Sequence, residues 1–303
     1  MADIVGIGAN VFDTLYNVPT YPVEDTKMRA VSSKASGGGP VATGLVAASK
    51  LGESAAYIGV LSNDNGGVYL KNDFIKYGVK TDYIEVKSGY RSFNSVLWLC
   101  QDSGSRTCVF DKGDLPELEL NDKQINAIKN AKILMVDGNE LSAAVKAAKI
   151  ARDNGVLVLY DCGGLYDGVK ELLALTDIMI PSEEFALGIT GETIAEKAAF
   201  KLYETYKPQV VVITQGKRGG ILYDGKTAVS YPIYPANVVD SNGSGDVFHG
   251  AFAAGISKGF DFLKCCHFAS ATSAIKCTGI GARESTPDFD TVRTFLKENG
   301  YEL

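Results

Sequence analysis

The sequence predicts one α/β domain spanning residues 1–303, with a mainly parallel central sheet covered by helices. Three observations favour this fold. The chain has 303 residues, 46% of them apolar, which is enough for a substantial core. Short β-branched or aliphatic runs alternate with helical patterns along most of the chain, as in successive β-α-β units. No internal repeat or low-complexity tract interrupts this alternation.

Six apolar runs are the expected strands of the sheet, at residues 4–8, 57–60, 133–136, 156–160, 178–180 and 210–214. Small or apolar residues at spacings of three and four predict helices over residues 41–51, 68–77, 142–154, 194–206 and 247–258. Residues 14–35 contain prolines without helical periodicity, and residues 90–113 form two alternating runs around a polar turn. We expect these two segments to form a small β-sheet lid beside the main sheet.

Composition and charge exclude several classes of protein. Thirty basic against thirty-six acidic residues give a formal charge of −6, and no run of like charge indicates a nucleic-acid or membrane surface. No apolar run reaches the roughly 18 residues that a membrane span needs. Six cysteines without a C-x-x-C pair, and no charged leader before the first strand, are typical of a cytosolic chain. We therefore expect a cytoplasmic protein that binds a small molecule.

The strongest local motif is residues 239–248, where a glycine-rich turn opens directly into an apolar helix. Gly243 and Gly245 allow the backbone to approach an anion, which the free N–H groups of the helix start would bind. Asp246, in the first turn, has two interpretations: a helix-capping residue, or a proton acceptor beside a bound phosphoryl group. Phosphoryl transfer requires the anion site and the acceptor together.

This segment resembles the D-T-x-G-A-G-D signature of the ribokinase-like (PfkB) carbohydrate kinases, in the form Asp240-Ser241-Asn242-Gly243-Ser244-Gly245-Asp246. Four further stretches resemble family motifs in the same order along the chain, at residues 36–52, 62–66, 211–216 and 281–287. The resemblance implies a three-layer ribokinase-like fold with a β-sheet lid, and transfer of the γ-phosphoryl group of ATP to a sugar hydroxyl with Mg²⁺. Residues 36–40 with Thr43, 247–251 and 276–278 are most similar to the branch that includes sulfofructose kinase and other ketose kinases.

The resemblance also implies roles for individual residues. Asp246 corresponds to the catalytic base, and Gly243, Ser244 and Gly245 to the anion hole. The corresponding substrate contacts are Asp13, Gly38, Gly39 and Thr43, and the nucleotide contacts are Thr214, Gly216, Ser270 and Ser273. Simpler interpretations remain open: Asp13 as a turn or capping residue, the glycines as turn residues, and the two serines as packing residues.

Several positions depart from the family pattern. Its N-x-x-E magnesium motif aligns with Ser182-Glu183-Glu184-Phe185, so Glu183 is the expected substitute. A monovalent-cation site, such as one for K⁺, would use backbone carbonyls near Asp240, Cys277 and Gly281. Pro40 and Thr43 differ from the residues of ribokinases, which favours a ketose or an acidic sugar derivative over ribose. The basic residues available to read an acidic group lie in the lid segments, where each is otherwise a solvated surface charge: Lys27, Arg29, Arg91 and Arg106.

The leading hypothesis is therefore an ATP-dependent kinase acting on a primary hydroxyl of a ketose-like sugar or acidic sugar derivative. Two alternatives stay open: a nucleoside or vitamin-alcohol kinase of the same fold, and a non-catalytic sugar-binding regulator. A dinucleotide site at Gly6-Ile7-Gly8 is disfavoured because the third glycine is missing. His249 and His267 lack partners at metal-ligand spacing and have an expected structural role. Exposed lid strands favour a homodimer formed through the lid.

Overall fold

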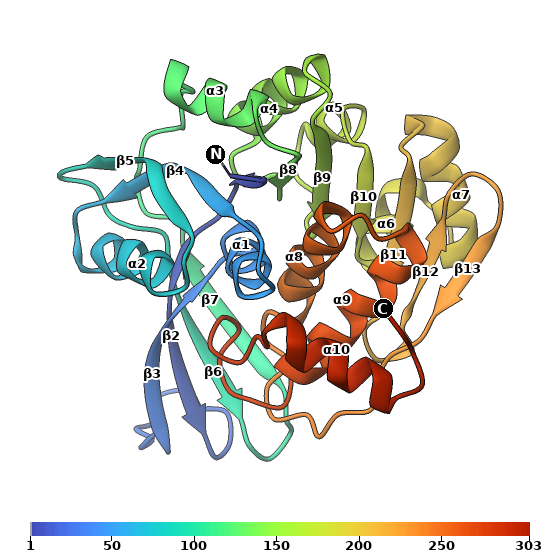
Figure 1. Ribbon diagram of the computed structural model, residues 1–303. Helices are drawn as coiled ribbons and strands as arrows, with labels where there is room; N and C mark the ends of the chain where they lie inside the picture. Colours follow the sequence, from blue (N-terminus) through green and yellow to red (C-terminus); the bar gives the residue numbers. More distant parts are fainter. Residues whose placement is uncertain (1) are drawn as a thin grey trace.

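The computed structural model describes residues 2–303 and contains two β-sheets (Figure 1). The larger sheet has nine strands in the order β13-β12-β11-β10-β9-β8-β1-β4-β5. All of its neighbouring strands pair in parallel except β11–β12 and β12–β13, which are antiparallel. The strands are β1 (Ile4–Ile7), β4 (Ala55–Ser62), β5 (Lys80–Lys87), β8 (Ile133–Val136), β9 (Leu157–Cys162), β10 (Ile178–Pro181), β11 (Val210–Thr214), β12 (Gly220–Tyr223) and β13 (Ala228–Tyr231). All six predicted strands are confirmed.

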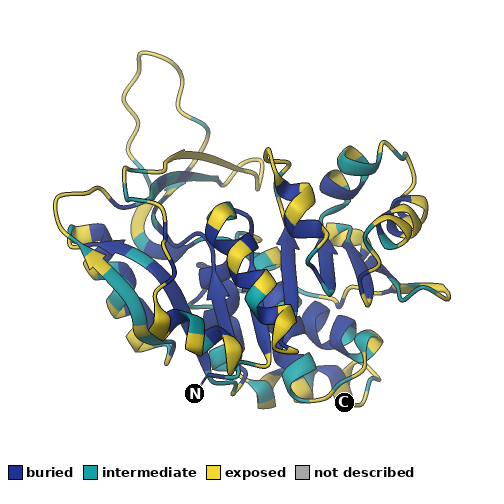
Figure 2. Ribbon diagram, turned by 90° about the horizontal axis from the view of Figure 1, so that it is seen from above, coloured by how far each residue is buried: buried dark blue, intermediate teal, exposed yellow. Residues whose placement is uncertain are grey.

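Helices cover both faces of this sheet. Consecutive residues of a strand point to opposite faces, so Ile4 packs in one apolar cluster and Val5 in the other. One cluster includes residues of α1 (Pro40–Lys50), α2 (Asn65–Lys76), α8 (Ser244–Ser257), α9 (Phe262–Lys276) and α10 (Phe289–Glu298). The other includes residues of α3 (Asp122–Lys129), α4 (Leu141–Asp153), α5 (Val169–Leu173), α6 (Glu183–Thr190) and α7 (Ala195–Tyr206). The result is a three-layer α/β/α arrangement with the buried sheet in the middle (Figure 2).

Local sequence explains where the helices begin. Pro40 is accommodated at the start of α1 because the first helical N–H has no intrahelical partner. Asn121 and Gln124 form a reciprocal capping box at the start of α3, and Asp261 accepts the Lys264 amide at the start of α9. Within residues 2–303, none of the helices combines the length and apolarity that crossing a bilayer requires.

The smaller sheet forms the lid, with the order β3-β2-β6-β7, at the lower left of Figure 1. Its strands are β2 (Val11–Val18), β3 (Ser32–Gly38), β6 (Asn94–Cys100) and β7 (Arg106–Asp111). The expected hairpin of residues 90–113 is present as the antiparallel pair β6–β7. The segment 14–35 contributes most of β2 and the start of β3, joined by the exposed loop 19–31. The lid continues directly into the main domain through Gly38 and Gly39, which brings it next to the start of α1.

Candidate functional site

The start of α8 forms an anion-binding turn. Gly243 lies in the left-handed region, with φ of 71°, immediately before the helix, and no side chain caps it. The amide groups of Gly243, Gly245 and Asp246 donate to no acceptor within the described residues, whereas Ser244 N donates to the Ser241 carbonyl at 3.2 Å. Three free N–H groups at the positive end of a helix dipole are a site for an anion such as a phosphoryl group.

The Asp246 carboxylate lies half-buried in the first turn of the same helix. It accepts no hydrogen bond from the described residues and is therefore not acting as a helix cap. Burial raises the pKa of Asp246, and the positive charges of His249 and Arg106 oppose this shift. The side chain is thus a carboxylate without a protein partner, beside an anion site, with an increased tendency to accept a proton.

His249 lies one turn further along α8 and is buried. Its Nδ1 lies 2.6 Å from the Gly245 carbonyl oxygen, and its Nε2 lies 3.0 Å from the Ile180 carbonyl oxygen. Both of these acceptors are main-chain carbonyl oxygens. Asp161 Oδ2 lies 3.2 Å from Nδ1; burial raises the pKa of Asp161 to about 7, against the attraction of His249. His249 therefore joins α8 to the end of β10, as the expected structural role requires.

Asp13 lies on β2 at the opposite side of the site. Its Oδ1 accepts the Ser95 hydroxyl at 2.6 Å, and its Oδ2 lies so close to Gly38 that a β carbon at that glycine would overlap it. Burial raises the pKa of Asp13 to about 6, opposed by the Ser95 hydrogen bond and the charge of Arg283, while Asp246 adds to the increase.

Two glycines, Gly44 in α1 and Gly250 in α8, allow these helices to pack closely. Helices α1 and α8 lie side by side (Figure 1), and a β carbon on Gly250 would overlap the Gly44 carbonyl. The start of α1 is fixed by Asp137 Oδ2, which accepts the amides of Ala9 at 2.9 Å and Val41 at 3.1 Å. A β carbon on Gly44 would also lie 3.3 Å from the Asp246 carbonyl oxygen, so α1 contacts the first turn of α8.

Arg283 is a fully buried side chain that the sequence analysis did not single out. Its Nη2 donates to the Gly38 carbonyl at 2.6 Å and to Asn10 Oδ1 at 2.9 Å, and its Nη1 donates to Asp73 Oδ2 at 2.7 Å. A β carbon on Gly37 would overlap the guanidinium. Arg283 therefore fixes the backbone of the glycine loop that faces Asp13.

A cavity of about 1040 Å³ opens beside the anion turn. It is lined by Thr214 and Gly216 from one side, by Ser270 and Ser273 from α9, and by Ser244 and Gly245, so it brings all four predicted nucleotide contacts together. Its lining also contains residues that the sequence analysis did not name, including an apolar wall and a lysine: Tyr231, Ile233, Phe248 and Lys217. The hydroxyls of Ser270 and Ser273 donate to the carbonyls of Pro232 and Ser244, both within 2.8 Å, and so have structural roles as well.

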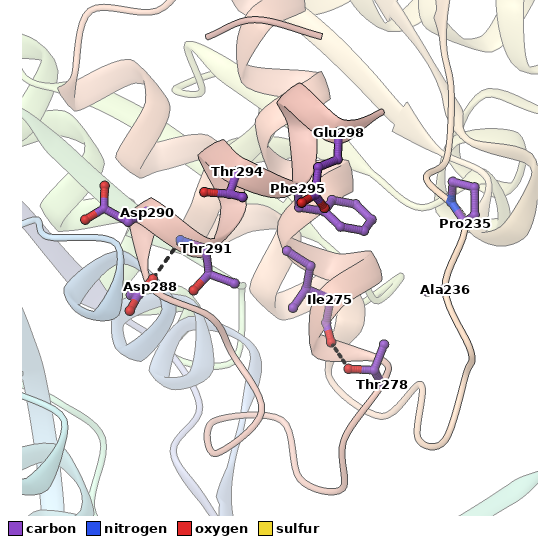
Figure 3. A pocket seen from close by; sticks show the side chains of 10 residues that line it. All are labelled: Pro235, Ala236, Ile275, Thr278, Asp288, Asp290, Thr291, Thr294, Phe295 and Glu298. Atoms are coloured by element: carbon purple, nitrogen blue, oxygen red, sulfur yellow. Dashed lines mark hydrogen bonds between the residues drawn. The ribbon is translucent and has the colours of Figure 1, made fainter. Parts of the chain in front are cut away.

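A second cavity, of about 550 Å³, lies between α9, α10 and residues 235–236 (Figure 3). Its side chains include Asp288, Asp290 and Glu298, and none of the described residues that line it is basic. Carboxylates repel phosphate, and neither Asp246 nor the Gly243 turn borders this cavity. The larger cavity is therefore the candidate nucleotide site.

Comparison with known proteins agrees with this geometry. A sequence model of the "pfkB family carbohydrate kinase" matches residues 1–288. The chain belongs to the pfkB family of carbohydrate kinases. It is 29% identical to a 5-dehydro-2-deoxygluconokinase of Clostridium beijerinckii, covering 99% of this chain and 94% of the relative. It is 26% identical to a ribokinase of Haemophilus influenzae, covering 96% and 97% of the two chains.

The fold of this pfkB family kinase also matches a solved structure. The ribokinase of Arabidopsis thaliana, determined with ribose and ATP, superimposes with a TM-score of 0.87 at 26% identity, covering 98% of this chain and 99% of the other. The three-layer arrangement and the lid expected from the sequence are therefore the architecture of a ribokinase-like carbohydrate kinase.

The four basic residues of the lid segments were expected to contact the sugar, and the structure places them in different surroundings. Arg91 is exposed and paired with Asp111 at 2.8 Å and Asp114 at 3.1 Å, so its charge is already matched. Arg106 donates to Asn242 Oδ1 at 3.2 Å and lines the nucleotide cavity. Lys27 and Arg29 lie on the exposed loop 19–31 and form no ion pair within the described residues. Arg106 thus lies at the larger cavity, next to the anion turn.

Three further residues expected in the site have contacts or burial that the sequence did not indicate. Both carboxylate oxygens of Glu183 accept hydrogen bonds, Oε1 from Gln215 Nε2 at 2.7 Å and Oε2 from Arg218, so Glu183 is tied to residues 215–218. Phe185, at the glutamate position of the family motif, packs edge-on against Tyr160 in the core. Asp240 Oδ1 accepts the Asn242 amide and Oδ2 accepts the Gly281 amide, which makes it a structural residue of the turn. The hydroxyl of Thr43 is fully buried in α1 and has no hydrogen-bond partner among the described residues.

Proposed function

We propose that this pfkB family kinase transfers the γ-phosphoryl group of ATP to a primary hydroxyl of a keto sugar or keto sugar acid, with Asp246 as general base. The observation that carries the proposal is the unpartnered Asp246 carboxylate beside three free amides at the start of α8. A helix cap would engage its carboxylate with those amides, whereas a base and an anion site must leave both groups free.

In the proposed reaction the acceptor hydroxyl lies between Asp13 and Asp246. Asp13 accepts a hydrogen bond from a neighbouring sugar hydroxyl, and Gly38 leaves room for the sugar against the backbone. Asp246 takes the proton as the acceptor oxygen bonds to the γ-phosphorus. The bond from that phosphorus to the β–γ bridging oxygen breaks, and ADP leaves. The amides of Gly243, Gly245 and Asp246, together with Arg106, offset the charge on the transferring group.

Magnesium is expected to enter as part of the Mg-ATP substrate. Residues 2–303 contain no group of three or more His, Cys, Asp or Glu side chains that could hold a metal ion. Mg²⁺ typically keeps several waters and binds through one or two carboxylates together with substrate phosphates. In this proposal Asp246 is reserved for the acceptor proton, so the metal ion would be held mainly by the phosphates and waters of the nucleotide.

The acceptor class rests on two arguments. A relative that is 29% identical to this chain is a 5-dehydro-2-deoxygluconokinase, whose name denotes a keto sugar acid. On the lid, Lys27 and Arg29 are basic side chains without ion pairs within the described part of the chain, and their loop adjoins β2, which carries Asp13. A carboxylate or sulfonate on the acceptor would find a charge-assisted partner there. Ribose and nucleosides carry no such group.

The test is an ADP-release screen with Mg-ATP against keto sugar acids, neutral ketoses, sugar sulfonates, ribose and nucleosides. We expect release with a keto sugar acid or a ketose, and none in excess EDTA. The double variant Lys27→Ala, Arg29→Ala is expected to raise the KM for the acidic acceptor by about 5–150-fold, without changing the KM for ATP. This is the effect of losing about 1–3 kcal/mol of charge-assisted hydrogen bonding. Turnover with nucleosides alone would contradict the proposed acceptor class but would still support kinase activity.

Acceptor binding is expected to weaken at acidic pH. The pKa of Asp13 is raised to about 6, so the carboxylate is ionised above that pH and, as the pH falls through it, loses the charge that strengthens its hydrogen bond from the sugar. Well below that value, each pH unit reduces the ionised fraction and the acceptor affinity about tenfold. Calorimetric titration of the acceptor without nucleotide measures this directly, and the same titration with Asp246→Asn removes the contribution of the other carboxylate that contacts the acceptor hydroxyl.

Asp13→Asn is the control for that pH dependence. Its amide has no titratable proton, so the affinity should be lower than that of the wild type at neutral pH and independent of pH below it. An acid limb that persists in Asp13→Asn would assign the dependence to another group.

The lid edge is our proposed homodimer interface. Strand β7 is exposed along its whole length at the edge of the small sheet, and Val109 and Phe110 are 56% and 60% exposed. Exposed apolar residues on an unpaired edge strand favour pairing with a second copy. A dimer that persists at equal strength in Phe110→Lys, measured by light scattering, would place the interface elsewhere.

A further inference from the structure

Lys276 is a fully buried lysine directly behind the anion turn. It is the last residue of α9 and has 0% exposure. Its Nζ donates to the main-chain carbonyl of Asp240 at 2.7 Å and lies 3.7 Å from Asp240 Oδ2. Burial lowers the pKa of Lys276, and the charges of Asp240, Cys277 and Asp246 oppose that shift. A charged group is rarely buried unless it is paired and hydrogen-bonded, so this position calls for a functional explanation.

The carbonyls expected to bind a monovalent cation are already occupied by protein donors. The Asp240 carbonyl accepts Lys276 Nζ. The Cys277 carbonyl accepts the amides of Val239 at 2.8 Å and Asp240 at 3.1 Å, and the Gly281 carbonyl accepts the Ser285 amide at 3.3 Å. A bound K⁺ would have to share these oxygens with the protein donors, and Lys276 already brings one positive charge to the first of them. The residues present therefore do not fit a monovalent cation.

The same ammonium is placed to act on the anion turn. Asp240 begins the turn, and its carboxylate fixes the Asn242 amide at 2.8 Å and the Gly281 amide at 2.9 Å. Lys276 holds the carbonyl of that residue, so it supports the path of residues 240–243. Its charge also lowers the pKa of Asp246, which means that its field reaches the reacting region.

We infer that the Lys276 ammonium takes the place of a monovalent cation behind the anion turn, so that this kinase works without K⁺. Lys276 is then a positioning residue, which acts through Asp240 and the turn rather than by touching the substrate. The expected effect of Lys276 on the rate rests on the proposed phosphoryl transfer. The expected response of the melting temperature to K⁺ rests on the Asp240 contacts alone.

The first experiment uses the wild-type protein. Its steady-state rate and its melting temperature are measured with KCl replaced by tetramethylammonium chloride at constant ionic strength. We expect both to be unchanged. Activation of the wild type by K⁺ of more than about threefold, or a melting temperature that rises specifically with K⁺, would overturn the inference.

The second experiment removes the ammonium. Lys276→Met keeps an apolar stem of similar length and should lower kcat by about 10–100-fold, the usual effect of removing a group that orients a site. Lys276→Ala also leaves space beside the Asp240 oxygens, so K⁺ should raise both its melting temperature and its rate, whereas tetramethylammonium should not. Lys258→Met is the matched control, because Lys258 is at the end of α8, pairs with Glu53 at 2.8 Å and lies outside the site. It should show neither effect.

The readouts separate this inference from the proposed function. If no acceptor supports turnover, the melting temperatures with K⁺ still decide the role of Lys276. A Lys276→Met protein with the rate and melting temperature of the wild type, or a Lys276→Ala protein whose melting temperature does not respond to K⁺, would show that the ammonium does not occupy a cation position.

Discussion

Replacing Gly243 with alanine is expected to lower kcat by about 10²–10³-fold, the usual effect of losing one donor from an anion hole. Gly243 has φ of 71°, a conformation that costs an alanine about 1–2 kcal/mol. An alanine β carbon would also overlap the Ala282 β carbon. Because Gly243 precedes the two free amides of Gly245 and Asp246, any shift of its backbone misdirects the donors that face the phosphoryl group.

A matched variant separates the anion site from the general cost of a strained backbone. Gly191 has the same φ of 71°, follows α6, and would place an alanine β carbon with no atom within 4 Å. Gly191→Ala should therefore lose only the stability that the backbone conformation costs, and keep full kcat. The double variant Gly243→Ala, Ala282→Gly removes the overlap and should recover part of the rate. A Gly243→Ala enzyme within tenfold of Gly191→Ala in kcat would mean that this turn does not bind the transferring group.

Local patterns in the sequence were sufficient for most of the fold. Strands β1, β4, β8, β9, β10 and β11 are short apolar runs because both faces of a covered sheet are buried, which makes them recognisable. The anion turn was also predictable, since a left-handed glycine, the free amides and the adjacent carboxylate occupy consecutive residues. Strand β2 was harder to predict, because its alternation of buried and more exposed residues begins at Val11 and is followed by the proline-containing loop after Val18.

Contacts between distant residues could not be predicted in the same way. Lys276 meets Asp240 across 36 residues, and Arg283 meets the Gly38 carbonyl across 245 residues. Neither shows a local pattern, although a lysine and an arginine inside or beside apolar helical stretches are a signal worth following. The lid arginines illustrate the same difficulty: the sequence shows that Arg91 and Arg106 are basic, but their partners depend on side-chain direction. Arg91 is neutralised by two aspartates and Arg106 faces the nucleotide cavity.

Asp246→Asn is the substitution with the largest expected effect. Asparagine keeps the shape and the capping ability of aspartate and removes the carboxylate that accepts a proton. We expect the rate to fall by about 10²–10⁴-fold, or ~3–5 kcal/mol at the barrier. Affinity for Mg-ATP and the melting temperature should stay close to those of the wild type, since Asp246 makes no hydrogen bond to the described protein.

The control for this substitution is Asp261→Asn. Asp261 is a true helix cap, whose carboxylate accepts the Lys264 amide at 2.8 Å at the start of α9. Because asparagine caps about as well as aspartate, Asp261→Asn should change neither the rate nor the stability by much. Comparable behaviour of the two variants would mean that Asp246 only supports a helix start.

The central claim is tested most directly by a single-turnover rate, measured by rapid quench with saturating Mg-ATP and the acceptor that the ADP-release screen selects. This measurement isolates the chemical step from product release. The account predicts that folded Asp246→Asn, with nucleotide affinity like that of the wild type, transfers the phosphoryl group at least about a hundredfold more slowly. A well-folded Asp246→Asn enzyme that retains more than about a tenth of the wild-type rate lies outside that range and would contradict the assignment of the base.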